Sequence, residues 1–274
     1  MMKKFKNLTL VVQWAKPTRM FSTSSLNTST VAVLYPYFIT GFSDGEGCFL
    51  ITVLKNPKLK TGWEVQLIFQ INLHIKDHTL LKLIQSSFNG VGSITKHGKN
   101  SIKYRVTSPQ NLAVIINHFD KYPLITQKRA DYELFKQAFE IVNRKEHLTY
   151  EGLHKIVAIK ASINRGLPDE LKAAICLGPY IVPVERPLVE DQKIQDPNWL
   201  AGFVDGEGCF YIMINKSKTY KLGYQVGLGF QCGQHTKDAQ LIKSFVDFLQ
   251  AGRLVFKKDQ PLVVYTVTKF SDIE

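Results

Sequence analysis

Apolar and polar residues show two different periodicities along the first half of the chain. Residues 39–47 place apolar side chains and glycines in one short helical stretch, whereas apolar residues alternate with polar ones from Phe49 to Asn72. A turn near residues 56–62 divides the alternating stretch, which therefore predicts a half-buried antiparallel pair of strands. The following pattern predicts a helix over 76–89, a second hairpin over 92–106, and helices at about 109–119 and 126–143.

This arrangement is predicted to occur twice. Residues 39–47, with the sequence ITGFSDGEG, recur 161 residues later at 200–208 as LAGFVDGEG, and Cys-Phe follows each copy. The same offset relates several later residues: Phe69-Gln70 to Phe230-Gln231, His74 to His235, Lys76-Asp77 to Lys237-Asp238, and Tyr104 to Tyr265. One α+β unit is therefore expected in two copies, a first unit over residues 35–143 and a second unit over 198–274.

Glycines inside the repeated helical stretch need a physical reason. Each glycine in a helix costs roughly 0.5–1 kcal/mol relative to alanine. Gly41 and Gly45 nevertheless recur as Gly202 and Gly206. Close approach of the two helix backbones would supply the reason, because only a hydrogen side chain permits it.

Two acids end each copy of the stretch. If the helices pair, Asp44 and Glu46 meet Asp205 and Glu207 at one end. Carboxylates placed so close repel each other unless a cation lies between them, and their hard oxygen ligands suit Mg²⁺. The alternative is that the acids cap two ordinary glycine loops.

The overall charge favours a polyanionic partner. Lys and Arg number 35 against 23 Asp and Glu, which gives a formal net charge of +12. A generic basic surface is the alternative. No stretch approaches the ~20 apolar residues of a membrane span, so no membrane association is expected. The four cysteines have no C-x-x-C spacing, which argues against a zinc site.

Both copies of the repeated stretch resemble the LAGLIDADG motif of homing endonucleases. The duplication resembles the single-chain, two-motif enzymes of fungal mitochondrial introns. The resemblance extends over residues 35–274 and includes YPLITQK at 122–128 and KEHLT at 145–149. It implies two αββαββα units with pseudo-two-fold symmetry. It also implies a monomeric, Mg²⁺-dependent enzyme of the mitochondrion that hydrolyses phosphodiester bonds in both strands of double-stranded DNA at a long site.

The resemblance assigns chemistry to the ends of the motifs. Glu46 and Glu207 match the acids that bind metal in this family, and they are the expected catalytic carboxylates. Gly45 and Gly206, beside them, are the further expected metal ligands. Asp44 and Asp205, one position earlier still, are expected to orient or cap the motif helices; a direct catalytic role is the alternative.

Two catalytic residues are expected outside the motifs. Lys128 matches a basic residue near the scissile phosphates, where it would stabilise negative charge; a solvated helix lysine is the alternative. Gln234 matches a position that orders active-site water in relatives. The first copy departs from that pattern, because it has Leu73 at the equivalent position.

The polar face of each predicted sheet is expected to reach base edges in a DNA major groove. The candidates in the first unit are Thr52, Asn56, Lys58, Glu64, Gln66, Gln70, Asn72, Lys103 and Arg105. Those in the second unit are Tyr211, Met213, Asn215, Lys218, Gln225, Gln231, Arg253 and Lys257. Gly227, Gly229 and Gly233 share the second face and are expected to let its backbone approach DNA. Because the two faces differ, the predicted target is asymmetric; an ordinary solvated sheet face is the alternative.

The segments outside the two units carry separate expectations. Residues 1–34 form a basic leader without Asp or Glu, typical of a mitochondrial transit peptide, or a remnant of an upstream reading frame. Residues 144–197 are expected to link the units through helices near 150–164 and 168–176 and an extended Pro-containing stretch.

The second unit is expected to be truncated. First-unit residues beyond Ala113 have no counterpart before residue 274, including Lys128. Loss of the corresponding helices would leave Phe230, Phe256 and Tyr265 poorly covered. Two further functions stay open: a maturase that binds intron RNA, and an inactive remnant. The retained acids favour the nuclease, because RNA chaperoning does not need a carboxylate pair.

Overall fold

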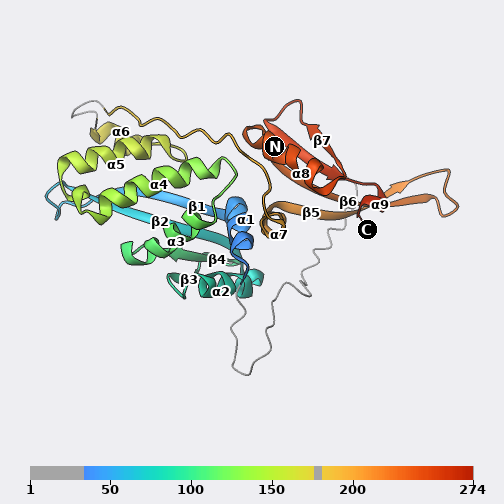
Figure 1. The fold of residues 1–274 in the computed structure, drawn as a ribbon, viewed down its shortest axis with the longest axis horizontal. Helices are drawn as coiled ribbons and strands as arrows, with labels where there is room; N and C mark the ends of the chain where they lie inside the picture. Colours follow the sequence, from blue (N-terminus) through green and yellow to red (C-terminus); the bar gives the residue numbers. More distant parts are fainter. Residues whose placement is uncertain (1–33, 176–180, 274) are drawn as a thin grey trace, which may run out of the picture.

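A computed structural model of the chain describes residues 34–175 and 181–273. Figure 1 shows two similar sheets joined side by side where helices α1 and α7 meet, with the remaining helices packed on the sheets. The predicted basic leader lies, except for Leu34, outside the described residues. None of the helices in the described ranges is both long and apolar enough to cross a membrane.

The first unit follows the predicted order of helix, hairpin, helix, hairpin and helices. Its elements are α1 (Pro36–Glu46), β1 (Gly47–Lys55), β2 (Trp63–His74), η1 (Ile75–Asp77), α2 (His78–Ser87), β3 (Ser93–Lys96), β4 (Ser101–Val106), α3 (Pro109–Lys121) and α4 (Lys128–Asn143). The strands form an antiparallel sheet in the order β1-β2-β4-β3. The predicted element types are confirmed, with boundaries shifted by only a few residues.

The second unit repeats the same topology. Its elements are α7 (Pro197–Glu207), β5 (Gly208–Lys216), β6 (Tyr224–His235), η3 (Thr236–Asp238), α8 (Ala239–Leu249), β7 (Arg253–Phe256), β8 (Leu262–Val267) and α9 (Phe270–Ile273). The strand order β5-β6-β8-β7 matches that of the first sheet. The registers match as well, because Phe49 pairs with Phe69 and Phe210 pairs with Phe230. The predicted duplication is thus confirmed at the level of the fold.

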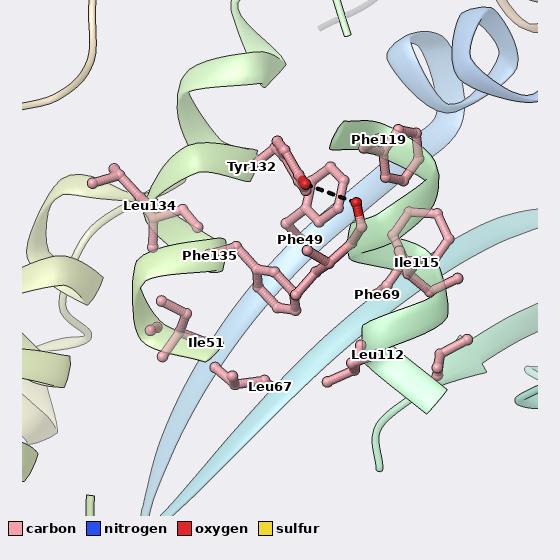
Figure 2. Packing of buried hydrophobic residues seen from close by; sticks show 14 of the residues in the cluster. Phe49, Ile51, Leu67, Phe69, Leu112, Ile115, Phe119, Tyr132, Leu134 and Phe135 are labelled. Carbon is pink, nitrogen blue, oxygen red and sulfur yellow. Dashed lines mark hydrogen bonds between the residues drawn. The ribbon is translucent and has the colours of Figure 1, made fainter. Parts of the chain in front are cut away.

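Alternating burial along β1 shows why this sequence forms a half-buried strand. Phe49, Ile51 and Val53 are buried, while the residues between them are partly exposed. Figure 2 shows α3 and α4 laying Leu112, Phe119, Tyr132 and Phe135 over this face of β1 and β2. The Tyr132 hydroxyl donates to Oδ1 of Asp120 at 2.7 Å and lies 3.1 Å from the Ile116 carbonyl oxygen. The apolar side of the first sheet is therefore closed by helices.

The segment between the units contains helices that pack against the first unit. It contains η2 (Glu146–Leu148), α5 (Tyr150–Ser162) and α6 (Asp169–Ile175), followed by residues 181–196 without regular secondary structure. Leu153, Ile156 and Ile163 belong to the same hydrophobic cluster as the first sheet. We therefore propose that the packed first unit extends through Ile163, beyond the predicted boundary at residue 143.

The second core is smaller, and one expectation about it was wrong. Phe230 and Tyr265 are buried, because α8 and the neighbouring strands cover them; only Phe256 is exposed as expected. Further exposed apolar residues lie on β5 and the first part of β6, among them Phe210, Ile214, Val226 and Leu228.

Candidate active site

The two motif helices meet through their glycines. A Cβ atom at Gly41 would lie 1.9 Å from the Trp199 carbonyl oxygen, and one at Gly202 would lie 2.0 Å from the Phe38 carbonyl oxygen. Neither distance leaves room for a methyl group, so both positions require glycine. The predicted close approach of the helix backbones is confirmed, and it brings the ends of α1 and α7 together.

Glu46 and Glu207 lie side by side at these helix ends. A Cβ atom at Gly45 would be 3.1 Å from Cγ of Glu207, and one at Gly206 would be 3.3 Å from Cγ of Glu46. The side chain of each glutamate therefore packs against the glycine at the end of the other motif helix. Burial raises the pKa of Glu46 above its usual value, and the charge of Glu207 raises it further. Burial likewise raises the pKa of Glu207.

This pair fits a divalent cation. Two partly buried carboxylates that disfavour each other's ionisation would both be stabilised by positive charge between them. Oxygen donors of this type suit a hard cation such as Mg²⁺. The described residues contain no cluster of three or more metal-ligating side chains. Remaining ligands would thus be water or phosphate oxygens, as is usual for Mg²⁺.

Asp44 orients the loop that precedes α4. Its buried carboxylate accepts hydrogen bonds from the backbone N–H groups of Ile125 at 3.0 Å and Thr126 at 3.2 Å. It also accepts from the Trp199 indole at 2.8 Å, which belongs to α7 of the second unit. Only the Trp199 contact reaches a motif helix, so the predicted role of Asp44 in orienting or capping the motif helices stays a prediction. Asp205, its repeat equivalent, is exposed.

Lys128 begins α4 and turns its ammonium group toward the end of α1. Its Nζ donates to the carbonyl oxygens of Ser43 at 3.0 Å and Gly45 at 2.8 Å. Desolvation lowers the pKa of Lys128, while the surrounding carboxylates oppose that shift. The Gly45 carbonyl oxygen thus accepts a hydrogen bond from the Lys128 ammonium group. Metal ligation by Gly45 or Gly206 stays a prediction.

A cleft of about 270 Å³ joins residues of both units around Lys128. Glu207 and Gln234 of the second unit line it opposite Lys128. A hydrogen bond from Gln234 opposes the burial-induced rise in the pKa of Glu207. The sequence-predicted Lys128, Glu207 and Gln234 therefore converge in one composite site, with Glu46 next to it.

The polar face of the first sheet holds an ordered network. Glu64 accepts hydrogen bonds from the Asn56 amide at 3.0 Å and the Gln66 amide at 2.7 Å. Those two hydrogen bonds lower the pKa of Glu64. Gln66 pairs with Thr52 across the strands, and Gln70 pairs with Arg105. The other predicted first-unit contacts lie on the same face or in the β1–β2 loop: Lys58, Asn72 and Lys103.

The second polar face differs in chemistry and corrects one prediction. A Cβ atom at Gly229 would lie 2.3 Å from the ring of Tyr211, its cross-strand partner. The space above Gly229 is therefore filled by that ring and is not open to a DNA backbone. The remaining second-unit candidates are exposed on the strands and turns, apart from the half-buried Met213: Asn215, Lys218, Gln225, Gln231, Arg253 and Lys257.

Comparison with known proteins decides the family. The LAGLIDADG endonuclease family matches residues 39–139 and 200–274, which contain both sheets and most of both motif helices. The chain belongs to the LAGLIDADG endonuclease family.

Relatives of this LAGLIDADG chain are intron-encoded proteins of fungi. Probable intron-encoded endonucleases 3 and 2 of Neurospora crassa are 41% and 40% identical to it over 87% and 88% of its length. The chain spans 44% and 54% of those two relatives, or about half. The crystal structure of the I-SmaMI LAGLIDADG homing endonuclease bound to cleaved DNA is 46% identical, with a TM-score of 0.85. That match covers 88% of this chain and 79% of I-SmaMI; another I-SmaMI structure holds uncleaved DNA in the presence of calcium ions.

Sequence reasoning missed several residues around the LAGLIDADG site. Asp238, on η3, is buried and accepts from the Gln127 backbone N–H at 2.7 Å. Gln192 and Arg186, from the segment between the units, also contact the loop before Lys128. Repetition of Lys76-Asp77 as Lys237-Asp238 was the one available signal for Asp238. Nothing in the sequence pattern distinguished Gln192 or Arg186.

Proposed function

We propose that this LAGLIDADG chain is a site-specific endonuclease that cuts both strands of DNA at a long asymmetric site. The observation that carries the proposal is the pair Glu46 and Glu207, held side by side where the two sheets meet. We further propose that it works with Mg²⁺, as a monomer, in the mitochondrion. The acid-free basic leader and the intron-encoded relatives support that location.

Each part of the site has a distinct chemical task. Glu46 and Glu207 would hold Mg²⁺, whose charge would neutralise the scissile phosphate and lower the pKa of an attacking water. The glycine contact of α1 and α7 fixes the positions from which the two glutamates extend. Lys128 places an ammonium group at the same cleft, where it stabilises the negative charge that develops on phosphorus-bound oxygens. Gln234 orients the Glu207 carboxylate.

The two polar sheet faces supply recognition. Hydrogen-bonding side chains on strands can read base edges in the major groove, with about 1–3 kcal/mol of discrimination for each good bidentate pair. The first face offers Gln66 and Thr52 where the second offers Gly227 and Met213. Because equivalent positions carry different chemistry, the two half-sites should differ in sequence. The DNA-bound structures of I-SmaMI support this use of the fold.

Cleavage of a plasmid library of intron-insertion sites tests the proposal directly. The full chain should linearise a small subset of plasmids with Mg²⁺ and only bind them with Ca²⁺. Sequencing of the cut ends would give the site. Absence of cleavage with Mg²⁺, combined with tight binding of intron RNA, would support a maturase instead. Absence of cleavage and of binding to either nucleic acid would overturn both.

A further inference from the structure

The segment that joins the two units contacts the active-site loop at several points. We name residues 181–196 the strap and residues 125–128 the lysine loop, because the loop ends at Lys128. Figure 1 shows the strap passing over α5 and α4 and then reaching α7. Three of its hydrogen bonds reach the lysine loop, and the others reach α4, α5, η3 and the start of α7.

Gln192 is the central residue of these contacts. It lies on the strap, is 1% exposed, and uses its side-chain amide twice. Its Nε2 donates to the Ile125 carbonyl oxygen at 3.1 Å and to Oδ1 of Asp238 at 2.6 Å. Asp238 Oδ1 in turn accepts from the Gln127 backbone N–H at 2.7 Å. Gln192 and Asp238 therefore bind the lysine loop from both sides with one connected set of hydrogen bonds.

The rest of the strap adds further contacts to the same loop. Arg186 donates from Nη2 to the Gln127 carbonyl oxygen at 3.1 Å. The Gln127 side chain donates to the Val189 carbonyl oxygen at 3.2 Å. Asp44 holds the N–H groups at the other end of the loop. The lysine loop is thus fixed by the first unit, the strap and the second unit together.

Burial makes this network sensitive to single changes. Removing one partner of a buried hydrogen bond leaves the other without the solvation it had in water. The lysine loop would then shift to regain partners, and a shift of about 1 Å in a charged group near the reacting phosphate is enough to slow catalysis about a hundredfold. Lys128 reaches the cleft only from the end of this loop.

We propose that Gln192 is a positioning residue, which acts through Asp238 and the lysine loop to place the Lys128 ammonium group against Glu207 of the second unit. The proposal rests on the proposed nuclease function for its catalytic consequence. The strap would thereby affect catalysis, because it connects the two units and also fixes the geometry of a site to which both units contribute.

Gln192→Met tests it, with Gln195→Met as the matched control. Methionine keeps about the length of glutamine but cannot donate either hydrogen bond. Gln195 is an exposed glutamine on the same strap. We expect Gln192→Met to lower single-turnover cleavage at saturating protein by about tenfold. DNA affinity measured with Ca²⁺ should stay within about twofold, because neither residue is on a DNA-facing sheet, and Gln195→Met should match the parent chain.

Two substitutions of Asp238 distinguish the effect of its hydrogen bonds from the effect of its charge. Both hydrogen bonds end on Oδ1, so Asp238→Asn can keep them while losing the charge, whereas Asp238→Ala loses both. We expect the asparagine variant to cleave nearly as well as the parent chain and the alanine variant to resemble Gln192→Met. Equal losses in both Asp238 variants would overturn the hydrogen-bonded positioning role.

A double substitution shows whether the effect runs through Lys128. On a Lys128→Met background, Gln192→Met should cause no further loss of cleavage, because the group it positions is already absent. Losses that multiply would mean that Gln192 supports the fold generally, and they would overturn the proposal.

Hydrogen exchange gives a readout independent of cleavage. In Gln192→Met the amides of Ile125, Thr126 and Gln127 should exchange about tenfold faster, while those of β2 remain as protected as in the parent chain. Unchanged exchange in the lysine loop would overturn the proposal even if cleavage falls. If the parent chain cuts no DNA, the nuclease function fails, but this measurement still decides whether Gln192 fixes the loop.

Discussion

The two units share a strand order and a repeat pattern, yet the same position has opposite surroundings in each. Phe49 is 1% exposed, whereas Phe210, its counterpart 161 residues later, is 58% exposed. In the first unit α3 and α4 cover β1 and β2 (Figure 2). In the described part of the second unit, α8 and the short α9 pack on β6, β7 and β8, and no residue of β5 belongs to the hydrophobic cluster.

The contrast shows what alternation in a sequence can and cannot predict. An apolar residue at every second position tells which face of a strand turns away from water. It does not tell what covers that face, because the covering helices are encoded elsewhere in the chain. Phe49 and Phe210 therefore lie in the same alternating sequence pattern but are expected to contribute differently to the free energy of unfolding.

The motif glutamates Glu46 and Glu207 have similar surroundings in the two units, since burial raises the pKa of each, and the largest effect is expected there. Glu46→Gln or Glu207→Gln should abolish cleavage of at least one strand, because an amide cannot supply the charge that holds a divalent cation. Specific DNA binding should remain nearly intact. Strand-resolved nicking of an end-labelled duplex measures the first outcome and a gel-shift titration the second. Full double-strand cutting by either variant would remove that glutamate from the mechanism.

The units should differ most in the response of their cores. Phe49→Ala should lower the free energy of unfolding by about 3–5 kcal/mol, because it opens a cavity under α3 and α4. Phe210→Ala should cost less than about 1 kcal/mol, since most of its ring is already in water. Urea denaturation followed by circular dichroism compares the two. Equal losses would mean that the exposed face of the second sheet is covered in solution.

Substitution of Lys128 tests whether the two DNA strands are cut by different sets of residues. Lys128→Met keeps the side-chain length but removes the ammonium group from the cleft with Glu207 and Gln234. We expect cleavage to slow about 10²–10³-fold, more for one strand than for the other, with little change in DNA affinity. The ratio of the two nicking rates is the measurement. A uniform slowing of both strands would contradict a composite site built around Glu207.

A pH dependence of the free energy of unfolding is expected that belongs to the first unit alone. Thr40 donates its hydroxyl to the Tyr122 carbonyl oxygen, so it accepts a hydrogen bond from Nε2 of His118. Burial lowers the pKa of His118 from 6.5 to about 4. As pH falls from 6.5 to 4 the unfolded chain binds a proton that the folded chain does not, and stability falls by up to about 3 kcal/mol.

His118→Gln isolates this contribution, because glutamine can still donate to Thr40 but does not titrate in this range. The difference in unfolding free energy between the parent chain and the variant should change with pH only between about 4 and 6.5. A constant difference from pH 7 to pH 4 would show that His118 titrates normally in the folded chain.

The sequence predicted the repeated part of the molecule well, for physical reasons. Helical spacing in the motif and alternation in the strands are local signals, and their duplication reinforced them. The convergence of Lys128, Glu207 and Gln234 followed from the family resemblance. The roles of Gln192 and Asp238 could not be predicted, because their hydrogen bonds join residues far apart in the chain. The ring of Tyr211 over Gly229 was missed because it depends on cross-strand packing.

The glycine contact between α1 and α7 also limits how such chains can be recombined. Gly41 faces the Trp199 backbone and Gly202 faces the Phe38 backbone, so each half carries a glycine together with the backbone surface that the glycine of the other half meets. A chimera that joins the first half of one relative to the second half of another would therefore assemble wherever both parents keep these glycines. The sheet faces could then differ freely, and new pairs of half-sites could be combined by exchanging whole halves.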